Sequence, residues 1–135
     1  MPKEIIEVPV LSETVRKLGV PLSLVTRANG LVYVSGMPPL DLATGKLVRG
    51  DIEVQTDASL KALQLCLETA GSSLAQVLMV RVYAANAGYY GAINRVYARY
   101  FPKDPPSRTT VGVAHLARAG LKIEIDMIAV VKDGV

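Results

Sequence analysis

The sequence predicts an α+β domain built on one mixed β-sheet of about six strands, with two helices packed on one face. Two runs near the C-terminus alternate with a period of two, and two longer segments before them repeat at helical spacing. An Asn-Gly pair between two other extended runs indicates a hairpin, which a doubly wound parallel sheet would lack. With 135 residues and no interdomain linker, residues 1–135 form a single domain.

The first third of the chain is expected to hold three short strands, with a helical turn between the first and the second. A type I′ turn needs positive φ at both central positions, so Asn29-Gly30 predicts a hairpin between the second and third strands. The third strand ends sharply at Ser35-Gly36, before two prolines. The predicted strands cover residues 5–8, 22–27 and 31–35, and the turn covers residues 12–18.

Apolar stripes and capping residues predict the two helices. Asp51 is suited to cap a helix over residues 52–70, where leucines recur at helical spacing. Asn86 is suited to cap a second helix over residues 88–100, whose tyrosine stripe is expected to pack in the core. Between the helices, residues 77–84 read VLMVRVYA, an apolar run typical of a strand buried on both faces.

Two further strands are predicted on either side of a loop over residues 114–120. In the first strand, Arg108 shares a face with Thr110 and Gly112, whose small size leaves room above the strand. In the second strand, Glu124 lies on the polar face. If the two strands pair as a hairpin, Arg108 and Glu124 fall opposite each other.

An arginine and a glutamate in such a position can do chemistry. The guanidinium group can bind a carboxylate through two parallel hydrogen bonds, and a nearby glutamate can position or activate a water. The alternative is an ordinary cross-strand salt bridge on a solvated face, a common arrangement that contributes little. Asn94 also leaves two interpretations open, because its amide either points to solvent or meets a polar partner.

Composition excludes several other classes of protein. The net charge of +3 comes from scattered basic residues, so we expect no nucleic-acid partner. Cys66 is the only cysteine and is expected to be buried, and His115 is the only histidine, so no disulfide and no metal site is predicted. The chain has no membrane-length apolar run and no signal peptide, which favours a soluble, cytoplasmic protein.

Four segments, in the same order along the chain, resemble the RidA/YjgF family of small enamine/imine deaminases. Together they span nearly the whole length of the chain, and the ordered set is more specific than any one of them. They are VYVSGMPPLDLATGKLV at 32–48, AINRVYARYF at 92–101, SRTTVGVAHL at 107–116 and LKIEIDMIAVV at 121–131.

The resemblance implies a chorismate mutase-like fold that assembles as a homotrimer, with ligand clefts between subunits. It also implies hydrolysis of reactive 2-enamino and 2-imino acids to 2-keto acids and ammonia, without a cofactor. Arg108 would bind the substrate carboxylate and Glu124 would position the attacking water. The polar lining of the cleft would include Ser35, Gly36 and Asn94, and the cleft would also include Thr110 and Leu22.

Three positions depart from the pattern that is usual in the family. Leu22 stands where a pocket tyrosine is usual, Met37 where a glutamine is common, and Thr110 where a cysteine is frequent. These departures indicate a more apolar cleft and bear on substrate identity more than on reaction type. Two other functions stay open: a non-catalytic carboxylate sensor and, ranked last, an endoribonuclease, which would need a basic groove with stacking aromatics.

Overall fold

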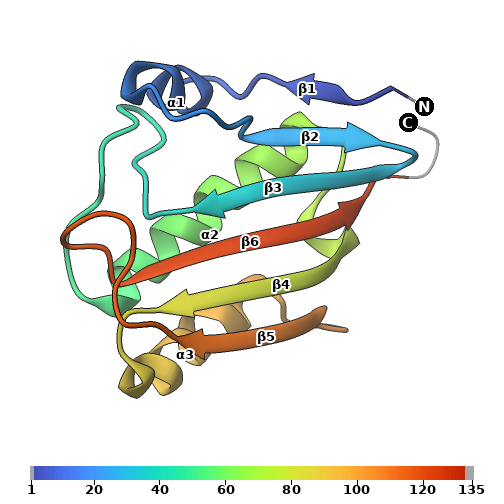
Figure 1. Ribbon diagram of the computed structural model, residues 1–135. Helices are drawn as coiled ribbons and strands as arrows, with labels where there is room; N and C mark the ends of the chain where they lie inside the picture. The colour runs from blue at the N-terminus through green and yellow to red at the C-terminus, as the bar shows by residue number, and fades with distance from the viewer. Residues whose placement is uncertain (1, 133–135) are drawn as a thin grey trace.

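The computed structural model describes residues 2–132 as one six-stranded mixed sheet with three α-helices (Figure 1). The strand order is β1-β2-β3-β6-β4-β5, and only the β4–β5 pair is parallel. The strands are β1 Glu4–Ile6, β2 Val25–Ala28, β3 Leu31–Met37, β4 Val77–Ala84, β5 Ser107–Gly112 and β6 Ile123–Val130. The helices are α1 Leu11–Leu18, α2 Ile52–Thr69 and α3 Tyr90–Tyr100, with short 3-10 turns at Leu74–Gln76 and Ala87–Tyr89.

The last two strands do not pair as a hairpin, so the condition that would set Arg108 opposite Glu124 is not met. β6 pairs with β3 and β4 in the middle of the sheet, whereas β5 pairs only with β4 and forms the edge. The burial of the two strands explains their places. In β6 every second residue is fully buried and the residues between are half-buried, while β5 exposes most of its residues and therefore tolerates an edge position.

The two faces of the sheet differ. Figure 1 shows α2 and α3 together on one side of the sheet, which confirms the prediction of two helices on one face. That face carries the buried core, including Val80, Val82, Ile125 and Met127. No helix within residues 2–132 covers the other face. The remaining helix, α1, lies at the β1 edge of the sheet (Figure 1). We call the uncovered side the open face.

Most local signals in the sequence are confirmed. Asn29 and Gly30 both have positive φ, as a type I′ turn requires, and the Asp51 carboxylate accepts a hydrogen bond from the Val54 amide at the start of α2. The second strand is shorter than predicted, because it begins at Val25 and leaves Leu22 in the preceding loop. Cys66 is buried as expected, and burial raises its thiol pKa to about 12.

Candidate functional site

Arg108 lies on the helix-covered face, at the edge of the sheet, where β5 passes under α3. Its Nε donates a hydrogen bond to Thr110 Oγ1 at 2.9 Å, and its Nη2 donates one to Asn94 Oδ1 at 2.7 Å. The guanidinium carbon also lies 4.4 Å from the centre of the Tyr97 ring and 5.6 Å from the centre of the Tyr90 ring. We call these five residues the Arg108 cluster. Two hydrogen bonds and an aromatic face hold the guanidinium in one orientation.

The fixed guanidinium keeps donors to spare. Two of its five N–H groups are used by Thr110 and Asn94, and no other hydrogen bond or ion pair from this side chain exists among residues 2–132. A half-buried arginine with free N–H groups and a set orientation suits a carboxylate better than a mobile surface arginine does. Beside it, Thr110, Gly112, Ala87 and Tyr90 line a small hollow of about 110 Å³.

Glu124 lies on the open face, over a break in the neighbouring strand. Between Val34 and Met37, β3 carries one residue more than β6 does, so Ser35 and Gly36 form a β-bulge. The Glu124 carboxylate lies directly against Gly36: a Cβ at that position would come 3.0 Å from Glu124 Cδ and closer still to its Oε2. Gly36 is therefore required so that the carboxylate can lie over the strand.

The surroundings of Glu124 favour its neutral form. Burial raises the pKa of this carboxyl, and the nearby carboxylate of Asp126 raises it further. Asp126 is itself satisfied, because it accepts hydrogen bonds from Arg81 Nε at 2.8 Å and from the Tyr83 hydroxyl at 3.2 Å. Glu124 has no hydrogen-bond donor within the described part of the chain. A carboxylate with a raised pKa and no partner is suited to accept a proton from water.

Leu22 and Ser35 lie on the same open face. Together with Gly36 and Asp126 they line a concavity of about 580 Å³. The Leu22 side chain is 45% exposed in the single chain, so it belongs to the surface of this concavity and not to the core. The Ser35 hydroxyl donates to the carbonyl of Ser23 at 2.7 Å, which fixes the bulge to the loop that carries Leu22. We call Leu22, Ser35, Gly36 and Glu124 the Glu124 cluster.

The sheet separates the two clusters. Arg108 pairs with Val80 of β4, whereas Glu124 pairs with Tyr83 of the same strand. Residues three apart on a strand point to opposite faces, so Arg108 and Glu124 lie on opposite sides of the sheet. One chain thus brings Arg108 together with Asn94 and Thr110. It places Glu124 against Gly36, which lines a concavity with Leu22 and Ser35. It does not bring the two groups to one ligand.

Sequence reasoning missed the roles of Tyr90 and Tyr97 beside Arg108. Both were expected to pack in the core. Tyr97 does so, and its ring also lies against the guanidinium, whereas Tyr90 is exposed. Burial raises the pKa of Tyr97 to about 12, so the ring stays neutral, and its hydroxyl has no hydrogen-bond partner among residues 2–132. The spacing from Asn94 to Tyr97, one helical turn, could have indicated that both face the same neighbour.

The described residues contain neither a cluster of metal ligands nor a membrane-spanning helix. Residues 2–132 hold no group of three or more His, Cys, Asp or Glu side chains placed to bind a metal ion. Within the same range, no helix is long and apolar enough to cross a membrane.

The geometry above defines a small mixed-sheet domain with an oriented, half-buried arginine at one edge of the sheet, and comparison with known proteins identifies its family. The family model described as endoribonuclease L-PSP matches residues 17–131. A RutC family protein from Pyrococcus horikoshii is 38% identical over 109 residues, which cover 81% of this chain and 86% of that protein. The chain belongs to the RidA/YjgF family, as its motifs predict.

Two further comparisons bear on activity and fold. The chloroplastic Reactive Intermediate Deaminase A of Arabidopsis thaliana is 37% identical over 109 residues, covering 81% of this chain and 58% of that protein. The crystal structure of YyfA from Yersinia pestis, a member of the Rid family, has a TM-score of 0.85 at 33% identity, covering 96% of this chain and all of that chain. The predicted fold class is confirmed, and the family includes reactive intermediate deaminases.

Proposed function

We propose that this protein is an enamine/imine deaminase that hydrolyses 2-enamino and 2-imino acids to 2-keto acids and ammonia. The observation that carries the proposal is the orientation of Arg108, whose guanidinium is held by Thr110, Asn94 and Tyr97 while other N–H groups stay free. The substrate carboxylate would accept two hydrogen bonds from this group. Charge-assisted bonds of this kind contribute about 1.5–3 kcal/mol each, and they also fix the position of the neighbouring imine carbon.

Glu124 supplies the proton chemistry in this proposal. The enamine first tautomerises to the imine, gaining a proton at carbon and losing one from nitrogen. A water then attacks the imine carbon while the Glu124 carboxylate accepts one of its protons and passes it to nitrogen, which gives a carbinolamine. Glu124 next accepts the remaining hydroxyl proton and passes it to the same nitrogen, so that the carbon–nitrogen bond breaks, ammonia leaves and the keto acid forms. The raised pKa of Glu124 supports this role, because a stronger base accepts the proton more readily at neutral pH. No cofactor takes part in these steps.

The reaction needs two subunits, because Arg108 and Glu124 lie on opposite faces of one sheet. We place the reacting cleft between the Arg108 cluster of one subunit and the Glu124 cluster of its neighbour in a homotrimer. The open face supports association, since it exposes large apolar side chains on three strands: Tyr33 is 43% exposed, Val111 is 41% exposed, and Ile128 is half-buried. Apolar surface of this kind is expected to be covered by another subunit.

Hydrolysis itself is tested directly. An amino acid oxidase generates 2-imino acids in solution, and semicarbazide traps the portion that survives. We expect the purified protein to lower the trapped fraction and to speed the release of ammonia. If the protein binds 2-keto acids but leaves the trapped fraction unchanged, the deaminase proposal is wrong and a carboxylate sensor is indicated.

Mixed trimers test the shared cleft. Arg108→Ala and Glu124→Gln are each expected to be inactive as homotrimers. When the two variants are unfolded, mixed in equal amounts and refolded together, one cleft in four combines an intact Arg108 with an intact Glu124, so about a quarter of the wild-type activity should return. If both residues acted from one chain, no cleft would be restored, and absence of recovery in mixed trimers of the correct mass would exclude the shared cleft.

A further inference from the structure

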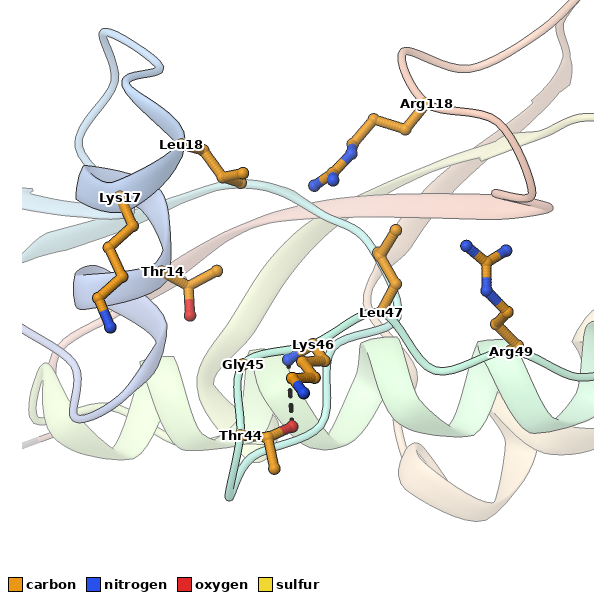
Figure 2. A pocket seen from close by; sticks show the side chains of 9 residues that line it. All are labelled: Thr14, Lys17, Leu18, Thr44, Gly45, Lys46, Leu47, Arg49 and Arg118. Atoms are coloured by element: carbon orange, nitrogen blue, oxygen red, sulfur yellow. Dashed lines mark hydrogen bonds between the residues drawn. The ribbon is translucent and has the colours of Figure 1, made fainter.

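A second concavity, of about 550 Å³, lies away from both clusters (Figure 2). It is bordered by α1, by the loop between β3 and α2, and by the loop that leads into β6. Four of its lining residues are cations, Lys17, Lys46, Arg49 and Arg118, and none of its lining residues is acidic. Its volume is in the range of pockets that bind small molecules. We call it the basic pocket, and it shares no residue with the Arg108 or Glu124 clusters.

The cations of the basic pocket differ from four of the six other arginines in the sequence. Each of Arg16, Arg27, Arg81 and Arg95 lies within 4 Å of a carboxylate oxygen. By contrast, the side chains of the four pocket cations make no ion pair and no hydrogen bond within residues 2–132. Like charges gathered without a counter-charge repel one another and oppose the compact state. A bound anion would remove this repulsion.

The two arginines reach the basic pocket from separate loops. Figure 2 shows Arg118 reaching down from the loop before β6, with Leu47 between it and Arg49. Arg49 also touches that loop, since a Cβ at Gly120 would come 2.6 Å from Arg49 Nη1. The Gln55 side chain of α2 donates to the Gly120 carbonyl at 3.1 Å and accepts from the Lys122 amide at 2.8 Å, so the loop is anchored where it passes Arg49.

The α1 side of the basic pocket is equally well packed. Gly45 has a φ of +73°, and a Cβ there would collide with the Thr14 side chain of α1. The loop between β3 and α2 therefore lies tightly against that helix. Leu18 and Leu47 add apolar surface between the cations. The basic pocket is thus a hollow formed by three packed segments, with charged groups at its rim and leucine side chains among them.

We propose that the basic pocket binds a small phosphorylated metabolite that carries at least two negative charges. The guanidinium groups of Arg49 and Arg118 match phosphate oxygens in a bidentate geometry, and Lys17 and Lys46 add point charges. The leucine side chains fit the carbon part of such a molecule. A monocarboxylate would leave most of the positive charge uncompensated. This proposal does not depend on the deaminase reaction, because the two sites have no residue in common.

Binding is tested with inorganic pyrophosphate and ADP as probes, at an ionic strength held constant with chloride. We expect saturable binding of one probe per chain by calorimetry, and a thermal midpoint that rises with probe concentration. The double variant Arg49→Gln/Arg118→Gln should weaken binding at least tenfold. Its thermal midpoint without probe should not fall, because the substitutions remove repulsion. The matched control, Arg99→Gln/Lys103→Gln, removes the same charge from exposed positions outside the basic pocket and should bind within about twofold of the wild type.

Three results would overturn the proposal. The first is the absence of saturable binding of either probe to the wild type. The second is an equal loss of binding in the control double variant, which would indicate an effect of overall charge. The third is binding of a single-stranded RNA oligonucleotide, lost in Arg49→Gln/Arg118→Gln, by a protein that binds neither pyrophosphate nor ADP, since this would assign the surface to a polymer.

Discussion

The Arg108 and Glu124 clusters hold their charged groups in opposite ways. Arg108 is fixed by contacts, with hydrogen bonds to Thr110 and Asn94 and the Tyr97 ring against its plane. The Glu124 carboxylate occupies space that is free because Gly36 has no side chain. No described residue donates a hydrogen bond to this carboxylate. A group that only binds benefits from fixed contacts. A group that exchanges protons benefits from a raised pKa, which hydrogen bonds to the carboxylate would lower.

The largest effect is expected from Arg108→Ala, which removes the guanidinium group from the Arg108 cluster. Losing two charge-assisted hydrogen bonds to the substrate should lower kcat/KM roughly 10²- to 10⁴-fold. Thermal unfolding should show that the chain stays folded, because Arg108 is half-buried at the edge of the sheet. Arg108→Lys should be nearly as poor, since an ammonium group cannot reproduce the fork that Thr110 and Asn94 orient. Full kcat/KM in either variant would remove Arg108 from the mechanism.

Gly36→Ala disturbs the Glu124 cluster without replacing a charged residue. The added Cβ would occupy the space of the Glu124 carboxylate, which must then move. A misplacement of about 1 Å in a reacting group costs roughly 10²-fold, so kcat should fall by about that factor while 2-keto acid affinity changes little. The measurement is kcat by ammonia release, together with the Kd of a 2-keto acid by calorimetry.

Gly91→Ala is the matched control for that variant. A Cβ at Gly91, within α3, would lie 3.9 Å from Arg95 Nη1, which is an ordinary van der Waals contact. The substitution should leave kcat unchanged and raise the free energy of unfolding by about 0.5–1 kcal/mol, because alanine favours a helix over glycine. If both glycine variants lose the same activity, the contact between Gly36 and Glu124 is not what matters.

The sequence predicts residue types on faces better than it predicts which strands are neighbours. The small residues beside Arg108 and the Asn29-Gly30 turn depend on local spacing, and both were predicted correctly. The place of β6 between β3 and β4 depends on contacts between segments far apart in the chain, which no local period records. A hairpin of the last two strands would set Arg108 opposite Glu124, whereas the observed strand order separates them. For the same reason the sequence predicts a strand end at Ser35-Gly36, where the structure has a β-bulge within β3.

Leu22→Tyr tests whether the Leu22 side chain of the Glu124 cluster contacts the substrate. Leu22 is half-exposed in the concavity that also holds Ser35 and Gly36, so it offers an apolar wall where a tyrosine would add a hydroxyl. The wild type should prefer imino acids derived from leucine and methionine to the one derived from serine. One apolar contact changes discrimination by about 1–3 kcal/mol, so the variant should shift the kcat/KM ratio toward serine by about tenfold. An unchanged ratio in a stable variant would place Leu22 outside the cleft.

The smallest effect is expected from Asp126→Asn, which changes the electrostatics of Glu124 without changing its position. A general base must be deprotonated, so activity should fall as pH drops through the raised pKa of Glu124. Burial is the larger cause of that raised pKa and remains in the variant, but the like charge of Asp126 is removed. The acid limb of the kcat/KM profile should therefore move to lower pH, while the plateau stays nearly constant.

Tyr83→Phe is the control: it removes a hydrogen bond to Asp126 but leaves the negative charge of Asp126 in place. The acid limb of the kcat/KM profile should therefore move less in Tyr83→Phe than in Asp126→Asn. Equal profiles for Asp126→Asn and the wild type would mean that Glu124 is not the group that titrates.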